Sequence, residues 1–125
     1  MVFQERTYSV LIVTASDSFT EKIMPLLPVT DYWPVTTAHS NSEARRKILE
    51  TAFDIVLINA PLPDDFGMRL AIDICTGSGA GVLLMVRSDQ FDDVYARVVG
   101  YGVLTLSRPT SVQMVAQNLR ILCAT

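Results

Sequence analysis

Charged residues, histidine and cysteine are scarce in this sequence of 125 residues. Only 18% of the residues are charged and 50% are hydrophobic, a composition that excludes a disordered or low-complexity chain. The single histidine is His39, and the two cysteines, Cys75 and Cys123, have no CxxC spacing. These counts do not favour a Ser-His-Asp or Cys-His catalytic group, a disulfide framework or a Cys/His metal centre. Isolated thiols suit a reducing compartment, so the expected location is cytoplasmic.

Long apolar runs and basic clusters are also missing. No apolar run approaches the ~20 residues that a membrane span needs, and Glu5 and Arg6 stand where a signal peptide would be apolar. The net charge is -3 and the largest basic cluster is the triplet at residues 45–47. A surface that follows nucleic-acid phosphates is therefore not expected. We expect no membrane contact and no direct nucleic-acid binding by this segment.

Short apolar runs alternate with helical patterns along the chain. The predicted strands span residues 8–13, 33–38, 53–58, 82–86 and 103–106. Ser18 with Glu21 predicts a capping box for the first helix, which Pro25 should shorten. Ser40 with Glu43 predicts a capping box for the second helix.

Strict alternation of strands and helices favours parallel pairing with right-handed crossovers that cover both faces of a sheet. The predicted fold class is α/β: a single doubly wound five-stranded parallel sheet sandwiched by five helices, in one domain over residues 1–125. Pro34 in the second strand indicates a sheet edge. In such sheets a ligand site lies outside the carboxyl ends of the strands, so the residues just past each strand are the candidates.

Four runs at these positions, VLIVTAS, FDIVLINAPLPDDFG, VLLMVRS and LSRP, resemble those of a CheY-like response-regulator receiver domain, and the resemblance covers essentially the whole chain. It implies a flavodoxin-like fold with strand order 2-1-3-4-5. It also implies a pocket with an acidic pair that holds Mg²⁺, a phosphoacceptor Asp, a Ser or Thr, a switch aromatic and a Lys. The matching positions here are, in that order, Thr14 with Ala15, Asn59, Val86, Thr105 and Arg108.

None of the reactive residue types stands at these positions. Mg²⁺ binds poorly without carboxylates, and an Asn amide is not a nucleophile that forms an acyl phosphate, so Asn59 should not be phosphorylated. Val86 and Thr105 cannot act as the hydroxyl and aromatic of the switch, so the domain should rest in one conformation. We interpret the chain as a degenerate or pseudo-receiver, not an enzyme, with no catalytic, cofactor-binding or metal-binding residues.

Arg108 keeps a positive charge where the family has Lys, and we expect it to pair with an acid such as Asp17 or Asp65. Two alternatives remain open. A residual phosphorelay receiver would use Asp64 or Asp65 with weak Mg²⁺ binding. A small-molecule-binding flavodoxin-like domain would have unrelated chemistry.

The last helix predicts an interaction surface. Its inward face is expected to consist of Val112, Val115, Leu119 and Leu122. Met114 and Ile121 then point away, and Tyr101 is exposed near the end of the fourth helix. The receiver resemblance implies a homodimer through helix 4, strand 5 and helix 5. Scattered exposed apolar side chains without a partner are the alternative.

The last helical pattern continues to Thr125 without a glycine stop. We therefore expect the N-terminal part of a longer regulator with an output domain in cis. Gly102 and Val103, together with the Ser-Arg-Pro run, are similar to sequences of ANTAR-type antiterminator regulators. The predicted function is a non-catalytic, dimerising receiver-like module of a two-component system that controls transcription or antitermination.

Overall fold

The computed structural model describes residues 6–124, and five parallel strands form its sheet. Glu5 and Thr125, on which two expectations from the sequence depend, lie outside the described residues. The strands are β1 (Tyr8–Val13), β2 (Tyr32–Ala38), β3 (Ile55–Asn59), β4 (Gly81–Arg87) and β5 (Leu104–Arg108). The α-helices of the described part are α1 (Asp17–Ile23), α2 (Asn41–Glu50), α3 (Met68–Gly77), α4 (Phe91–Val98) and α5 (Val112–Cys123).

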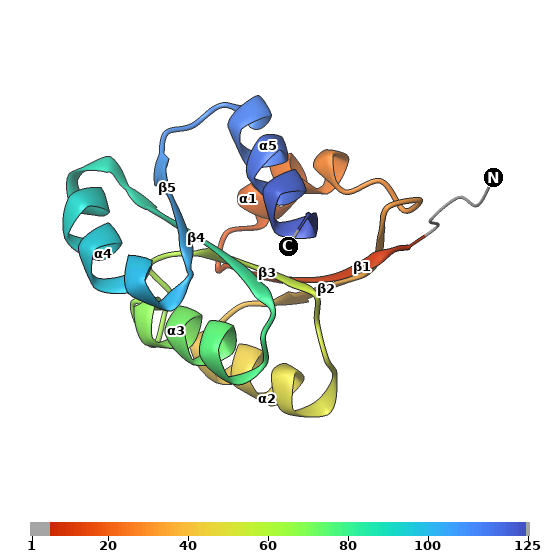
Figure 1. Cartoon of the computed structure of the whole chain (residues 1–125), viewed down its shortest axis with the longest axis horizontal. Helices are drawn as coiled ribbons and strands as arrows, with labels where there is room; N and C mark the ends of the chain where they lie inside the picture. The colour runs from red at the N-terminus through yellow and green to blue at the C-terminus, as the bar shows by residue number, and fades with distance from the viewer. Residues whose placement is uncertain (1–5, 125) are drawn as a thin grey trace.

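The strand order is β2-β1-β3-β4-β5 and every pairing is parallel, which confirms the predicted fold class. Helices α1 and α5 cover one face of the sheet and α2, α3 and α4 cover the other (Figure 1). β2 lies at an edge, as Pro34 indicated. None of the helices in residues 6–124 has the length and apolar character needed to cross a bilayer.

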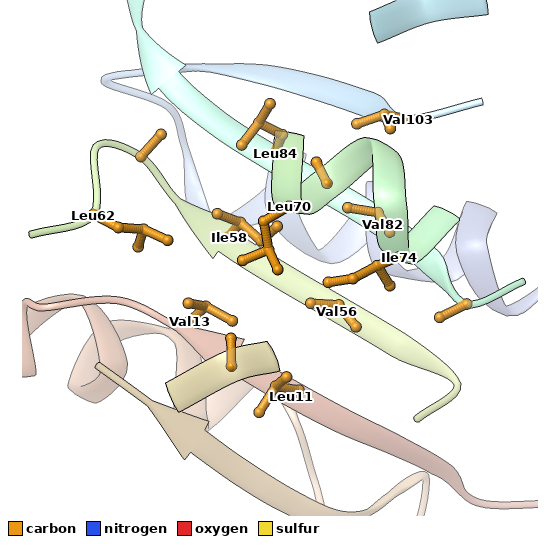
Figure 2. Packing of buried hydrophobic residues seen from close by; sticks show 14 of the residues in the cluster. Leu11, Val13, Val56, Ile58, Leu62, Leu70, Ile74, Val82, Leu84 and Val103 are labelled. Carbon is orange, nitrogen blue, oxygen red and sulfur yellow. The ribbon is translucent and has the colours of Figure 1, made fainter. Parts of the chain in front are cut away.

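The core follows the two-residue period of the strands. Leu11 and Val13 of β1 pack on the α2, α3 and α4 side, whereas Val10 and Ile12 pack on the α1 and α5 side. Figure 2 shows the first of these layers, in which Leu70 and Ile74 of α3 lie over the apolar side chains of β3 and β4. A sheet buried on both faces accounts for the nearly continuous apolar runs of β1, β3 and β4.

Helix α1 begins at a different cap from the predicted one. Ser16 is the N-cap, and its hydroxyl accepts the backbone N–H of Phe19 at 3.2 Å. The prediction of Ser18 was wrong because Asp17 and Ser18 are already helical, so the start is set two residues earlier by the end of β1. The helix is short, as Pro25 predicted, and continues as a 3₁₀ turn over Met24–Leu26.

Helix α2 begins where the sequence places it. The Ser40 hydroxyl accepts the backbone N–H of Glu43 at 3.1 Å. The Glu43 carboxylate accepts the backbone N–H of His39 at 2.7 Å, one residue before the cap. The hydrogen bond from the His39 N–H is the largest cause of the lowered pKa of Glu43, and the charge of Lys47 also lowers it.

Candidate functional site

Two polar side chains meet where the strand order reverses between β1 and β3, which is where a doubly wound sheet places its ligand site. Thr14 follows β1 and Asn59 ends β3. The Nδ2 group of Asn59 donates a hydrogen bond to Oγ1 of Thr14 at 3.0 Å. The same oxygen accepts the backbone N–H of Ser16 at 3.1 Å. Thr14 is only 2% exposed, so this hydroxyl is a buried acceptor for two donors.

Arg108 extends this polar group to the end of β5. Its Nη1 donates a hydrogen bond to Oδ1 of Asn59, across the intervening strand β4. The Asn59 amide is thus engaged at both ends, because its nitrogen faces Thr14 and its oxygen faces Arg108. We call Arg108, Asn59 and Thr14 the strand-end network; it contains one positive charge and no negative charge.

The expected pairing of Arg108 with an acid was wrong. None of the ion pairs found among residues 6–124 involves Arg108. Asp17 lies 4.0 Å from Nε2 of His39 instead. The reason is geometric: the Arg108 side chain runs along the sheet edge towards β3, where the Asn59 oxygen offers a fixed acceptor.

A second cation stands beside Arg108. Arg87 of β4 is its partner in strand register, and it forms an ion pair with Asp89 at 3.1 Å. The pKa of Arg108 is lowered, first by loss of solvent around the guanidinium and second by the charge of Arg87. An arginine remains protonated at neutral pH under such conditions, so this end of the sheet carries an uncompensated positive charge.

The other three positions of the predicted pocket take no part in this network. Ala15 is exposed and Val86 is fully buried in the apolar core. Thr105 lies beside Leu84 in the sheet register, and its Oγ1 is buried with no hydrogen-bond partner among residues 6–124. The structure therefore brings together Thr14, Asn59 and Arg108 and leaves the remaining positions separate.

The residues present do not fit a receiver-type magnesium site. Mg²⁺ requires oxygen ligands with negative charge, whereas Thr14, Ala15 and Asn59 provide none. Within residues 6–124, no group of three or more His, Cys, Asp or Glu side chains could hold a metal ion.

Asp64, one of the alternative phosphoacceptors, forms hydrogen bonds with the start of α2. Its carboxylate accepts the backbone N–H groups of Asn41 at 2.8 Å and Ser42 at 3.0 Å, the first residues of α2. These two hydrogen bonds, Asn41 first, lower the pKa of Asp64. Asp64 joins the loop after β3 to the start of α2, a link that sequence spacing does not reveal.

Ser16 is the residue of the site that the sequence analysis missed. It caps α1 with its hydroxyl and donates its own N–H to Thr14, so it connects the helix start to the strand-end network. Its position two residues after Thr14, just past the end of β1, could have identified it as a candidate. The capping-box pattern obscured it, because a glutamate stands three residues after Ser18 and a phenylalanine three residues after Ser16.

No protein-family model and no curated protein sequence matches this chain. Solved structures do match. A signal receiver domain of an HD domain-containing protein from Pseudomonas fluorescens Pf-5 superposes with a TM-score of 0.83 at 20% identity, covering 99% of this chain and 91% of that chain. A two-component response regulator from Clostridium difficile gives 0.81 at 18% identity, with 95% and 97% covered. The beryllofluoride-activated NtrC4 receiver domain dimer gives 0.79 at 23% identity, with 91% and 94% covered.

These superpositions establish the fold and nothing beyond it, because the identities are all below 25%. The chain is a doubly wound α/β domain of the flavodoxin-like class. Within that class, its fold is that of the receiver domains of two-component response regulators.

Proposed function

We propose that this chain is a non-catalytic, pseudo-receiver signalling module that accepts no phosphoryl group at residue 59. The observation that carries the proposal is the strand-end network. A receiver fold is present, but its strand ends hold a neutral amide between a hydroxyl and a guanidinium. The scaffold persists in this chain while the charges that its usual chemistry requires are absent.

The chemistry supports this reading of Asn59. An acyl phosphate forms on a carboxylate oxygen, and an amide is neither anionic nor appreciably nucleophilic at neutral pH. Arg108, which would neutralise a bound phosphoryl group, already donates to the Asn59 oxygen. Each of the two polar ends of the amide has a protein partner, so the side chain serves as a structural link between β1, β3 and β5.

The module would act through association with other protein surfaces. Tyr101, Met114 and Ile121 are exposed by 50%, 44% and 47%, as the sequence predicted. Tyr95 and Val99, four residues apart on α4 and its end, add two more exposed apolar side chains. We propose that this surface, formed by α4, β5 and α5, is a homodimer interface, and we call it the α4–α5 face.

The proposed context is a cytoplasmic regulator in which this domain controls an output domain in cis, in transcription or antitermination. The domain itself has no role in nucleic-acid binding under this proposal, since the net charge is -3. The likeness of the Gly102–Val103 and Ser-Arg-Pro runs to ANTAR-type regulators supports antitermination as the process.

Acetyl phosphate provides the test. The protein is incubated with acetyl phosphate and Mg²⁺ and its intact mass is measured, beside a receiver domain that has a complete acidic pocket. We expect the mass of one phosphoryl group on the control and none on this chain. A phosphoryl group at Asn59 or elsewhere in the pocket would overturn the proposal.

The same reaction tests the residual phosphorelay alternative. A phosphoryl group that disappears in the Asp64→Asn or Asp65→Asn variant would assign the phosphoacceptor to that carboxylate. The engagement of Asp64 with the start of α2 argues for no modification there.

A further inference from the structure

A groove of about 360 Å³ lies on the face of the sheet that α1 and α5 share. Figure 1 shows these two helices on one side of the sheet, with the loop after β5 leading into α5. Its apolar lining includes Phe19 and Ile23 of α1, Met85 of β4, and Val112 and Val115 of α5. Its volume falls within the range of ~300–1,000 Å³ that is typical of small-molecule sites.

Helix α1 and the 3₁₀ turn that follows it form one wall of the groove, and the loop after β5 with the start of α5 forms the other. Val112 was expected to point inward, but it is 51% exposed and only lines the groove. It is the first residue of α5, directly after the N-cap Ser111, and therefore lies beyond the part of the helix that packs on the sheet.

The charged residues of the groove are both cations. Lys22 and Arg108 line it and no acidic residue does. Neither cation takes part in the ion pairs found among residues 6–124. The chain as a whole has a net charge of -3, whereas this groove carries two positive charges and is therefore locally basic. The two positive charges therefore favour a ligand with an anionic group, and the apolar lining favours a ligand whose remaining part is hydrophobic.

We propose that this groove binds a small molecule that carries a carboxylate on an apolar body. The carboxylate faces Arg108 and Lys22, while the body lies along the exposed or half-buried side chains of Phe19, Leu26 and Val112. A guanidinium has five N–H donors, and within residues 6–124 Asn59 is the one hydrogen-bond partner of Arg108, so donors remain for a carboxylate. The site goes beyond the proposed function and does not depend on it.

Arg108 gives the site a connection to the rest of the molecule. Arg108 lines the groove, and its guanidinium holds the Asn59 amide. A carboxylate bound to its remaining N–H groups changes the charge that the Asn59 amide faces, so the strand-end network responds to occupancy. Met114 and Ile121 lie on α5, the helix that also borders the groove. A ligand in the groove therefore contacts the same helix that contributes to the α4–α5 face.

Decanoate is a suitable probe, with decanol as the uncharged match. We expect decanoate to shift the amide resonances of α1, β5 and the start of α5 saturably in a ¹H–¹⁵N spectrum, and decanol to bind much more weakly. Shifts of equal size with decanol, or shifts spread over the whole chain, would overturn the charged site. Resonances of α1 and α5 that change with protein concentration instead would assign the groove to a second copy of the chain.

Val112→Asp places a negative charge at the groove, and Val112→Asn is the matched neutral variant. An aspartate at the first position of a helix is favourable, so the fold is retained, as the thermal melt would check. We expect decanoate affinity to fall about fivefold more in Val112→Asp than in Val112→Asn, and Lys22→Gln to weaken it as well. Equal affinities in the two Val112 variants would contradict the proposal.

Discussion

Arg108, the last residue of β5, donates a hydrogen bond to the side-chain oxygen of Asn59, the last residue of β3, across the whole width of β4. Because Asn59 also donates to Thr14, one uncharged amide joins the carboxyl ends of β1, β3 and β5. The network fixes the orientation of the amide, since only one of its two ends can donate.

Replacing Thr14 and Thr105 by valine should have opposite effects on the stability of the fold. Thr14→Val removes an acceptor and leaves the Asn59 amide and the Ser16 N–H without a partner, so it should cost about 1–3 kcal/mol of stability. Thr105→Val removes a hydroxyl that has no partner, and the stability should be unchanged or higher. Urea unfolding of both variants measures the difference, and a larger loss in Thr105→Val would contradict the assignment of the network.

Asn59→Asp alone should not create a phosphoacceptor. The new carboxylate faces Arg108, but Thr14 and Ala15 still supply no negative charge for Mg²⁺. We expect the intact mass to stay unchanged after incubation with acetyl phosphate and Mg²⁺. A phosphorylated Asn59→Asp protein would mean that the site tolerates the loss of its acidic pair.

Asp64 should make the free energy of unfolding fall more steeply as the pH decreases. The N–H groups of Asn41 and Ser42 lower its pKa in the folded state, so its contribution to stability is present above the ordinary pKa of about 4. That contribution is lost as the pH falls through the lowered folded value. The stability difference between the wild type and Asp64→Asn should therefore be constant near neutral pH and shrink below about pH 4.

Asp65→Asn is the control for this measurement, because the Asp65 side chain takes part in none of the hydrogen bonds found in residues 6–124. Urea unfolding from pH 3 to 7 gives the two curves. If Asp64→Asn and Asp65→Asn gave the same pH dependence, the hydrogen bonds of Asp64 to α2 would not be significant in solution.

The α4–α5 face predicts a change in oligomeric state. Ile121→Glu should shift the protein towards the monomer in sedimentation at high micromolar concentration, since it buries a charge in the proposed interface. Leu49→Glu is the matched control, because Leu49 is 87% exposed on α2, on the opposite face of the sheet. A wild type that sediments as a monomer of 13.8 kDa at that concentration would rule out a stable dimer through this face.

The fold could be predicted from the sequence, because the local hydrophobic patterns and the geometry of a parallel sheet lead to the same arrangement. The apolar run at residues 8–13 matches β1 residue for residue, and the alternation of strands and helices led to the observed parallel sheet. The proximity of Thr14 and Asn59 also followed, because the carboxyl ends of neighbouring parallel strands lie at one edge. These features depend on the backbone alone.

Features that depend on side-chain reach were not predictable. Arg108 was expected to find an acid, but a long side chain can cross a strand, and the nearest fixed acceptor was an amide. Val112 satisfies the helical period of α5, yet the period does not show that the first turn lies beyond the sheet. The Asp64 carboxylate binds the backbone N–H groups of Asn41 and Ser42, which precede it by 23 and 22 positions in the sequence. A contact over that separation leaves no local sequence pattern.

A titration with Mg²⁺ and beryllofluoride, followed by ¹H–¹⁵N spectra of the backbone amides, tests the central interpretation most directly. A Thr14→Asp, Ala15→Asp, Asn59→Asp triple variant, which restores three carboxylates at the strand ends, serves as the positive control. We expect that the amide resonances of the wild type near residues 14, 59 and 108 do not move, whereas those of the triple variant do. Saturable shifts of these resonances in the wild type would show that a metal and a phosphoryl mimic bind there, and the pseudo-receiver interpretation would then be wrong.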